Sequence, residues 1–201
     1  MAKNYDVELT FTEALLGTAP LDKEIYTTYI AEKKADLASD DLNDEVDTLN
    51  EDKGVTGFHT DPDGHPFLYN YMIRGFFKDA CGMLRRSKET RSSKITAYKK
   101  IIDGLVFVYP RHIHLHMPKG LVTGILERPL RAQTPQGERV ALSKSESAPI
   151  GTKIKFRIKV IDTKTIDLEQ LEEWLDYGQD RGLGQWRNGG YGTFEYTIAE
   201  A

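Results

Sequence analysis

The chain contains a single cysteine, Cys81, among its 201 residues. One cysteine excludes an internal disulfide and a zinc site made of several thiolates. No apolar run approaches the roughly 20 residues of a membrane-spanning helix, and the first ten residues lack the apolar core of a signal peptide. These absences predict a cytoplasmic protein that makes no contact with a membrane.

Motifs of the common enzyme classes are also absent. The sequence has no GxSxG, HExxH, Walker-type or kinase motif, so no motif assigns a reaction to it. We expect no bound cofactor and no metal ion. Enzymatic activity is left open, and a protein that is not an enzyme is favoured.

Length and composition are those of one globular domain. The 39% of hydrophobic and 29% of charged residues are typical of a folded chain, and 201 residues can bury a sizeable core. We predict a single domain over residues 1–201 with two insertions. One is acidic and covers residues 25–60, and the other is a hairpin excursion over residues 111–150.

The net charge of −4 argues at first against a nucleic-acid partner. Residues 31–53, however, hold nine acidic residues against three lysines, and the rest of the chain holds 24 basic and 22 acidic residues. Residues 74–100 hold nine basic residues against two acidic ones. Because the charges are segregated along the chain, the average does not exclude a polyanionic partner.

Hydrophobic periodicity divides the chain into regular elements. Strands are predicted over residues 5–12, 105–117 with a break at Pro110, 153–162 and 192–198. Residues 121–126 are predicted to return as the hairpin partner of the second strand. Helices are predicted over residues 69–86 and from Asp167 to Gly178, and residues 87–100 as a flexible basic connection. Asp167 and Gln170 have the spacing of a capping box at the second helix.

The order of these elements is strand, helix, strand, strand, helix, strand. This order predicts an α+β fold with a ferredoxin-like core, the arrangement of modified RNA-recognition domains. In it, two helices cover one face of an antiparallel sheet, and the insertions extend from that core.

Two predicted elements carry a row of basic side chains. On the first helix, Arg74, Lys78 and Arg85 lie opposite the apolar face. On the third strand, Lys155, Arg157 and Lys159 continue a row that Lys153 begins, and apolar residues alternate with them. Such rows can bind phosphates, although composition alone favours ordinary solvation for the row on the helix.

The stretch Gly178–Gly192 contains six glycines among fifteen residues. Arginine and aromatic side chains lie between the glycines, a composition that is typical of a binding loop and not of a flexible serine-glycine linker. The stretch opens a strand, whereas phosphate-binding and dinucleotide-binding glycine motifs open a helix. The candidate contacts within it are Arg181, Gln185, Trp186, Arg187 and Tyr191. Trp186 can equally be buried in the core.

Three histidines, His112, His114 and His116, alternate along the second strand. Period-two spacing places their imidazoles on one side of the strand. They can be plain solvent-facing residues, RNA contacts, or catalytic or metal-binding groups. No acidic residue within the strand is placed to orient them.

Three segments resemble parts of the RAMP superfamily of CRISPR-associated proteins, most closely its backbone subunits that bind guide RNA. They are the opening strand and its exit, VELTFTEALLGTAP, the entry into the first helix, DGHPFLYNYMIRGFFKDACGMLRR, and the C-terminal stretch RGLGQWRNGGYGTFEYTI. The resemblance implies a ferredoxin-like core that holds an RNA backbone. It makes Lys78 the basic contact of the first helix, and it makes Arg181, Gln185, Arg187 and Tyr191 the contacts of the glycine loop. It also implies that other CRISPR effector subunits, or copies of this chain, are partners.

Three functions therefore remain. The leading one is a non-catalytic protein that binds single-stranded guide RNA through its phosphates. The second is an endoribonuclease of the same fold that uses one of the three histidines as its acid or base. The third is an inhibitor or decoy of a CRISPR complex, derived from a phage, in which the acidic segment 31–53 mimics nucleic acid.

Overall fold

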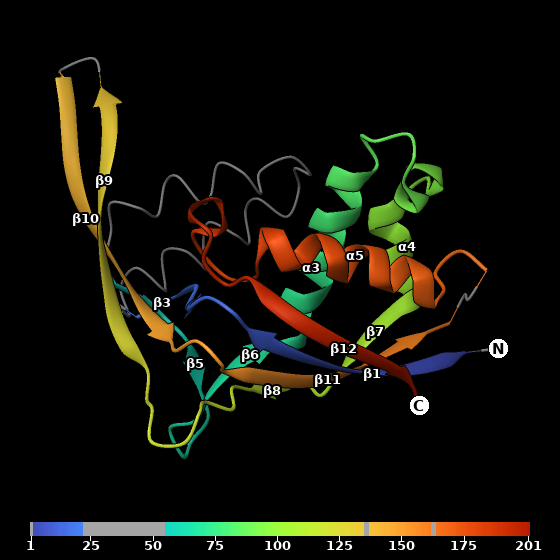
Figure 1. The fold of residues 1–201 in the computed structure, drawn as a ribbon, viewed down its shortest axis with the longest axis horizontal. Coiled ribbons are helices and arrows are strands. Elements are labelled where there is room, and N and C mark those ends of the chain that lie inside the picture. The colour runs from blue at the N-terminus through green and yellow to red at the C-terminus, as the bar shows by residue number, and fades with distance from the viewer. Residues whose placement is uncertain (1, 22–54, 135–136, 162–163) are drawn as a thin grey trace.

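The computed structural model describes residues 2–21, 55–134, 137–161 and 164–201 of the chain (Figure 1). Its main sheet has four strands in the order β12–β1–β11–β7, and all three pairings are antiparallel. Two helices, α3 and α5, connect these strands. The six elements are β1 (Lys3–Phe11), α3 (Asn70–Leu84), β7 (Val106–Tyr109), β11 (Lys153–Val160), α5 (Leu168–Arg181) and β12 (Phe194–Glu200). The predicted ferredoxin-like α+β fold is confirmed.

The sheet forms because its strands alternate apolar and polar residues in register. Val7 on β1 lies opposite Phe156 on β11, and both are buried. One residue along, Asp6 lies opposite Arg157 on the other face, where both are exposed. Directly opposite residues share a face, so one side of the sheet is apolar throughout and is covered by the helices.

Helices α3 and α5 pack on that apolar side (Figure 1). The rings of Phe77 and Trp174 lie 5.4 Å apart between the two helices. The prediction that Gly178 ends the second helix is wrong, since α5 continues to Arg181 and Gly182 follows as its C-cap. Gly178 instead allows close packing, because a Cβ there would lie 2.5 Å from the rings of Phe76 and Phe194.

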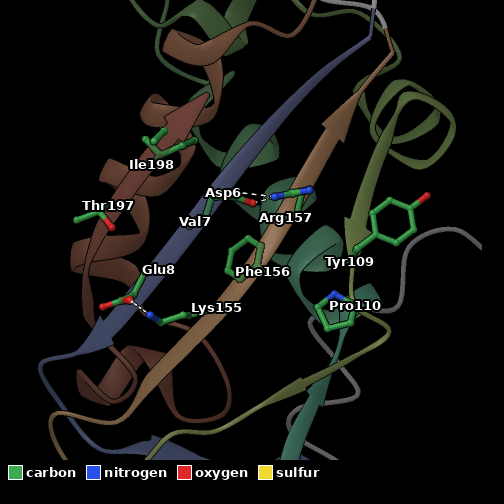
Figure 2. A pocket seen from close by; sticks show the side chains of 11 residues that line it. Asp6, Val7, Glu8, Tyr109, Pro110, Lys155, Phe156, Arg157, Thr197 and Ile198 are labelled. Atoms are coloured by element: carbon green, nitrogen blue, oxygen red, sulfur yellow. Dashed lines mark hydrogen bonds and ion pairs between the residues drawn. The ribbon is translucent and has the colours of Figure 1, made fainter. Parts of the chain in front are cut away.

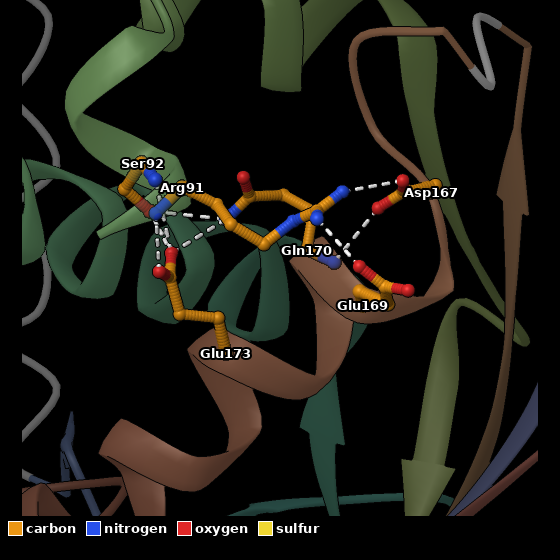
Figure 3. A network of polar contacts seen from close by, with 6 residues as sticks. All are labelled: Arg91, Ser92, Asp167, Glu169, Gln170 and Glu173. Atoms are coloured by element: carbon orange, nitrogen blue, oxygen red, sulfur yellow. Dashed lines mark hydrogen bonds and ion pairs between the residues drawn. The ribbon is translucent and has the colours of Figure 1, made fainter. Parts of the chain in front are cut away.

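Residues 87–100 do not form the flexible connection that we predicted. They contain the 3₁₀-helix η1 (Arg91–Lys94) and the start of helix α4 (Tyr98–Leu105). Figure 3 shows the polar network that joins η1 to α5. Ser92 is fully buried, donates to Glu173 Oε2 at 2.6 Å, and accepts from Trp174 Nε1 at 2.9 Å.

Of the two hydrogen bonds expected in the capping box of α5, only the one accepted by Asp167 is confirmed. The Asp167 side chain accepts a hydrogen bond from the backbone N–H of Gln170 at 2.9 Å. The Gln170 amide, however, donates to Ser92 Oγ at 3.0 Å. The polar network therefore takes the side chain that a reciprocal capping box would use.

The predicted hairpin also pairs differently. Strand β9 (Gly124–Thr134) pairs with β10 (Gly137–Ala148), and not with the strand around Pro110 as expected. In Figure 1 this long hairpin projects away from the body of the protein. Near its C-terminal end, β10 also pairs with the short strands β2 (Leu15–Leu16) and β4 (Val55–Gly57). Strand β4 pairs in turn with β3 (Ala19–Pro20), and these strands form the second sheet.

A third sheet contains two of the three candidate histidines, His112 and His114. The predicted break at Pro110 divides the second strand into β7, in the main sheet, and β8 (His112–His114). Strand β8 pairs with β6 (Pro66–Tyr69), which in turn pairs with β5 (His59–Thr60). Most of the acidic insertion predicted at 25–60 lies outside the described residues. Among the described helices, none has the length and apolar character needed to cross a membrane.

Candidate nucleic-acid interface

The glycine loop, residues 182–192, is a folded element between α5 and β12. Four of its glycines have positive φ, including Gly192 at +72°. A Cβ on Gly192 would lie 1.9 Å from the carbonyl oxygen of Leu183, so no other residue fits there. The amide of Leu183 donates to the Gly192 carbonyl at 2.9 Å, and the Gly192 amide donates to the Ala14 carbonyl at 3.0 Å. The loop is thus tied to the exit of β1, which excludes a flexible linker.

Two arginines of the glycine loop region converge on one carboxylate. Arg187 Nη1 donates to Asp79 Oδ2 on α3 at 2.7 Å. Arg181 Nε lies 3.7 Å from the same oxygen. Because two guanidinium groups share a single negative charge, a net positive charge remains at this point. The sequence offered no local signal for Asp79, because it lies on the helix face between the apolar and the basic residues.

A third guanidinium reaches the loop from the hairpin. Arg128 on β9 places its Cζ 5.2 Å from the ring centroid of Trp186. A Cβ on Gly189 would lie 3.1 Å from Arg128 Nη1, so this glycine leaves room for the arginine. Sequence patterns alone do not reveal Arg128, since the pairing of β9 with β10 decides where it lies.

Two buried nitrogen donors in this cluster have no hydrogen-bond acceptor among the described residues. They are Arg181 Nε and Trp186 Nε1. Trp186 is only 9% exposed, which decides the open question about this residue in favour of burial. A buried donor without an acceptor costs about 1–3 kcal/mol, so each such group in a folded protein calls for a partner. The net positive charge of the arginines fits an anion with several oxygens, whereas the two donors are closed to solvent.

The other two predicted loop residues have structural contacts. Gln185 Oε1 accepts a hydrogen bond from Thr56 Oγ1 at 2.7 Å, which ties the loop to β4. Tyr191 is half-buried, and its ring centroid lies 6.0 Å from that of Trp186. Gln185 therefore positions the loop, while Tyr191 supports the tryptophan.

The basic row of α3 is partly engaged by α4. Lys78 Nζ lies 3.1 Å from Asp103 Oδ1, and the Arg85 guanidinium lies 5.0 Å from the ring centroid of Tyr98. Arg74 makes no ion pair with any residue of the described segments. All three side chains remain on the solvent side of the helix, as predicted.

The basic row of β11 is largely neutralised by β1, on the face of the sheet away from the helices (Figure 2). Arg157 donates to both oxygens of Asp6, at 2.7 and 2.8 Å. Glu8 lies 2.7 Å from both Lys153 Nζ and Lys155 Nζ.

The hydrogen bonds from these lysines lower the pKa of Glu8 to about 2. The surface, a shallow hollow of about 820 Å³ with Tyr109 at one side, is less cationic than the sequence indicates. Lys159 lies opposite Asn4 and makes no ion pair with a described residue.

The histidines gain an acidic partner that the sequence did not reveal. Asp61, in the turn between β5 and β6, has Oδ2 3.2 Å from His114 Nε2 and 3.3 Å from His65 Nδ1. Its other oxygen accepts the backbone N–H of His65 at 2.8 Å. On the same sheet, burial and the nearby His112 lower the pKa of His59. The third candidate, His116, pairs with Lys153 in a bridge to β11 and is exposed.

Comparison with known proteins places the fold. No protein-family model matches the sequence, and no curated protein matches it. The fold is similar to that of a chain in a Cmr-β complex. That chain belongs to the structure of the type III-B Cmr-β bound to cognate target RNA. The TM-score is 0.57 at 15% identity, over 99% of this chain and 60% of that one. At this identity the likeness shows a common fold and no more.

Proposed function

We propose that this protein binds single-stranded RNA as RAMP proteins do, holding the backbone of a guide RNA in or beside a CRISPR effector complex without cleaving it. The observation that carries the proposal is the convergence of Arg181 and Arg187 on the single carboxylate of Asp79, with Arg128 beside Trp186 in the same loop. Phosphate supplies the missing negative charge and accepts hydrogen bonds from guanidinium groups. The Cmr-β chain of similar fold comes from a complex with RNA, which supports the same interpretation.

The partner is expected to be read through its backbone and not through its sequence. Guanidinium contacts to phosphate carry no base information, and Trp186 is too buried to offer a ring face to a base. Lys78 and Arg74 on α3 extend the positive surface beyond the glycine loop. Binding is therefore salt-dependent, because each neutralised phosphate releases counterions.

Other effector subunits or further copies of this chain are the expected protein partners. The β9–β10 hairpin projects from the body, and an isolated two-stranded ribbon is marginally stable in water. Contact with a neighbouring subunit would support it. A cytoplasmic location agrees with such an assembly and stays a prediction.

The test is fluorescence anisotropy with a labelled oligouridine, titrated at low and at moderate salt. We expect tight binding at low salt and a linear fall of log K with log salt concentration. Absence of affinity at low salt, or equal affinity at both salt concentrations, would overturn the proposal.

A second candidate function is histidine-dependent RNA cleavage. The observation that favours it is the 3.2 Å contact between Asp61 Oδ2 and His114 Nε2, the arrangement of a general base with its orienting acid. A cleavage assay on the same RNA, with and without divalent cations, tests it. Cutting that disappears in His114→Ala would support the activity. Intact RNA under all of these conditions would exclude it.

The third hypothesis, an inhibitor or decoy, depends on residues 31–53, which lie outside the described part of the chain. It stays a prediction. Deleting these residues should abolish binding to a CRISPR complex if they mimic nucleic acid. Retained binding by the deletion variant, with an unchanged circular dichroism spectrum, would count against the mimic.

A further inference from the structure

Five aromatic rings pack together where the third sheet meets the start of α3. We call them the aromatic cluster, and its members are His59, Phe67, Tyr69, Tyr71 and His112. Tyr69 lies at the centre, with ring centroids 4.7 Å from His59 and 5.0 Å from Phe67. The rings of Tyr71 and His112 each lie 5.3 Å from that of Tyr69.

Strand register places the rings on one face. Tyr69 on β6 lies directly opposite His112 on β8, and Phe67 lies opposite His59 on β5. Directly opposite residues project from the same face of a sheet. The alternate residue Leu68 projects into the core and is 2% exposed. The four rings that lie on strands therefore occupy the face of the third sheet that points away from the core, and Tyr71 joins them from α3.

In the aromatic cluster, Phe67 is buried, whereas His112 and Tyr71 are exposed. Phe67 is 3% exposed, and the imidazole of His112 lies stacked on it, with centroids 4.2 Å apart and planes 26° from parallel. His112 itself is exposed. At the other end, Tyr71 is 53% exposed and lies nearly parallel to Tyr69, at 16°. Two rings held rigidly by the rings beneath them are thus presented to solvent.

Cationic side chains flank the exposed rings. The Arg111 guanidinium lies 5.9 Å from the ring centroid of Tyr69. Arg74 follows Tyr71 by three residues on α3, so the two side chains share a helix face. Rigid exposed rings beside cations are the combination that binds unpaired bases together with their phosphates. A positively charged rim favours this occupant over a purely apolar protein surface.

We propose that the aromatic cluster is a base-stacking site for single-stranded RNA. Bases stack on His112 and Tyr71, and the adjoining phosphates lie at Arg111 and Arg74. This inference rests on the proposed RNA-binding function and adds to it. The glycine loop holds the backbone, whereas the cluster contacts the bases.

The test compares oligoadenylate with an abasic oligomer of the same length, in the wild type and in a Tyr71→Ala/His112→Ala double variant. We expect the double variant to bind oligoadenylate about ten- to a hundredfold more weakly, with the salt dependence unchanged. Its affinity for the abasic oligomer should equal that of the wild type. With Tyr71→Phe in place of Tyr71→Ala the ring is kept, and the affinity for oligoadenylate that Tyr71 contributes should return.

A matched control comes from the same protein. Tyr109 is exposed to a similar degree, 49%, on the main sheet. Tyr109→Ala should bind oligoadenylate as the wild type does.

Each outcome separates the two proposals. Wild-type affinity for oligoadenylate in a folded double variant overturns the stacking site alone. An equal loss for the abasic oligomer also overturns it, since rings would then not be the cause. Failure of the wild-type protein to bind either oligomer at low salt overturns both proposals.

If the double variant does not fold, photo-crosslinking of wild-type protein to RNA that contains 4-thiouridine gives the answer. Crosslinks at Tyr71 or His112 support the site. Crosslinks confined to other residues overturn it.

Discussion

Arg187 donates a 2.7 Å hydrogen bond to Asp79, and this contact joins the glycine loop to a helix 108 residues earlier in the chain. The carboxylate holds the guanidinium in place and offsets part of its charge. Arg181 lies 3.7 Å from the same oxygen. Asp79 thus orients two arginines without neutralising both, which leaves the glycine loop with an attraction for anions.

Replacing one of these arginines should change the salt dependence of RNA binding. For Arg187→Gln we expect the slope of log K against log salt concentration to become shallower by about 0.7, the value for one lost phosphate contact to a single strand. Anisotropy titrations across a salt series measure it. Arg91→Gln is the control, because Arg91 pairs with Asp167 and Glu169 at the opposite end of α5. An unchanged slope in Arg187→Gln would contradict the assigned contact.

Glycines of the loop should differ sharply in their tolerance of a side chain. In Gly192→Ala, positive φ combines with a Cβ placed 1.9 Å from a backbone oxygen, so we expect a loss of about 3 kcal/mol or more. Gly190→Ala meets only the strain of positive φ, since nothing lies within 4 Å of its Cβ, and should cost about 1–2 kcal/mol. Urea unfolding of both variants gives the comparison. Equal losses of unfolding free energy in the two variants would contradict this, because they would mean that the backbone at Gly192 shifts to make room for the added Cβ.

The buried hydroxyl of Ser92 should contribute measurably to stability. Ser92→Ala removes the acceptor of two side-chain donors, Trp174 Nε1 and Gln170 Nε2. Ser92 and Gln170 are among the residues drawn in Figure 3. We expect the free energy of unfolding to fall by about 1–3 kcal/mol. Ser93→Ala is the matched control, with an expected change within about 0.5 kcal/mol, because the Ser93 hydroxyl donates to the nearby backbone carbonyls of Lys88 and Thr90. A change in Ser92→Ala no larger than the control would show that water replaces the hydroxyl.

Stability at low pH should depend on Glu8. Its pKa is lowered from 4.5 to about 2 by hydrogen bonds from Lys153 and Lys155. Since the folded state lowers the pKa, the contribution is present above pH 4.5 and is lost as the pH falls through about 2. We expect Glu8→Gln to flatten the fall of stability in this window, measured by denaturant unfolding at several pH values. Glu195→Gln on β12, where no ion pair forms with a described residue, should leave the fall as steep as in the wild type.

Local patterns were sufficient for the main elements. Two-residue alternation predicted β1 and β11, and the 3.6-residue period predicted α3, because these periods follow directly from backbone geometry. The Asp167 cap was predicted for the same reason, since donor and acceptor lie three residues apart. The order of these elements then indicated the ferredoxin-like core. Gly178 shows the limit of local rules, because a glycine that ends a helix and one that admits a neighbouring ring look alike in sequence.

Contacts between distant residues could not be predicted in this way. The sequence placed Arg181 and Arg187 in a binding loop, but it held no sign that Asp79 and Arg128 meet them there. It likewise showed a basic row on β11, but not the carboxylates of β1 that pair with it.

The sequence by itself therefore determined the elements, their order and the residue types of the site. The tertiary structure alone decided which charges remain without a counter-charge and which rings are buried. The physical reason is that charge balance and burial depend on neighbours in space, and strand pairing and helix packing bring those neighbours from positions far apart in the chain.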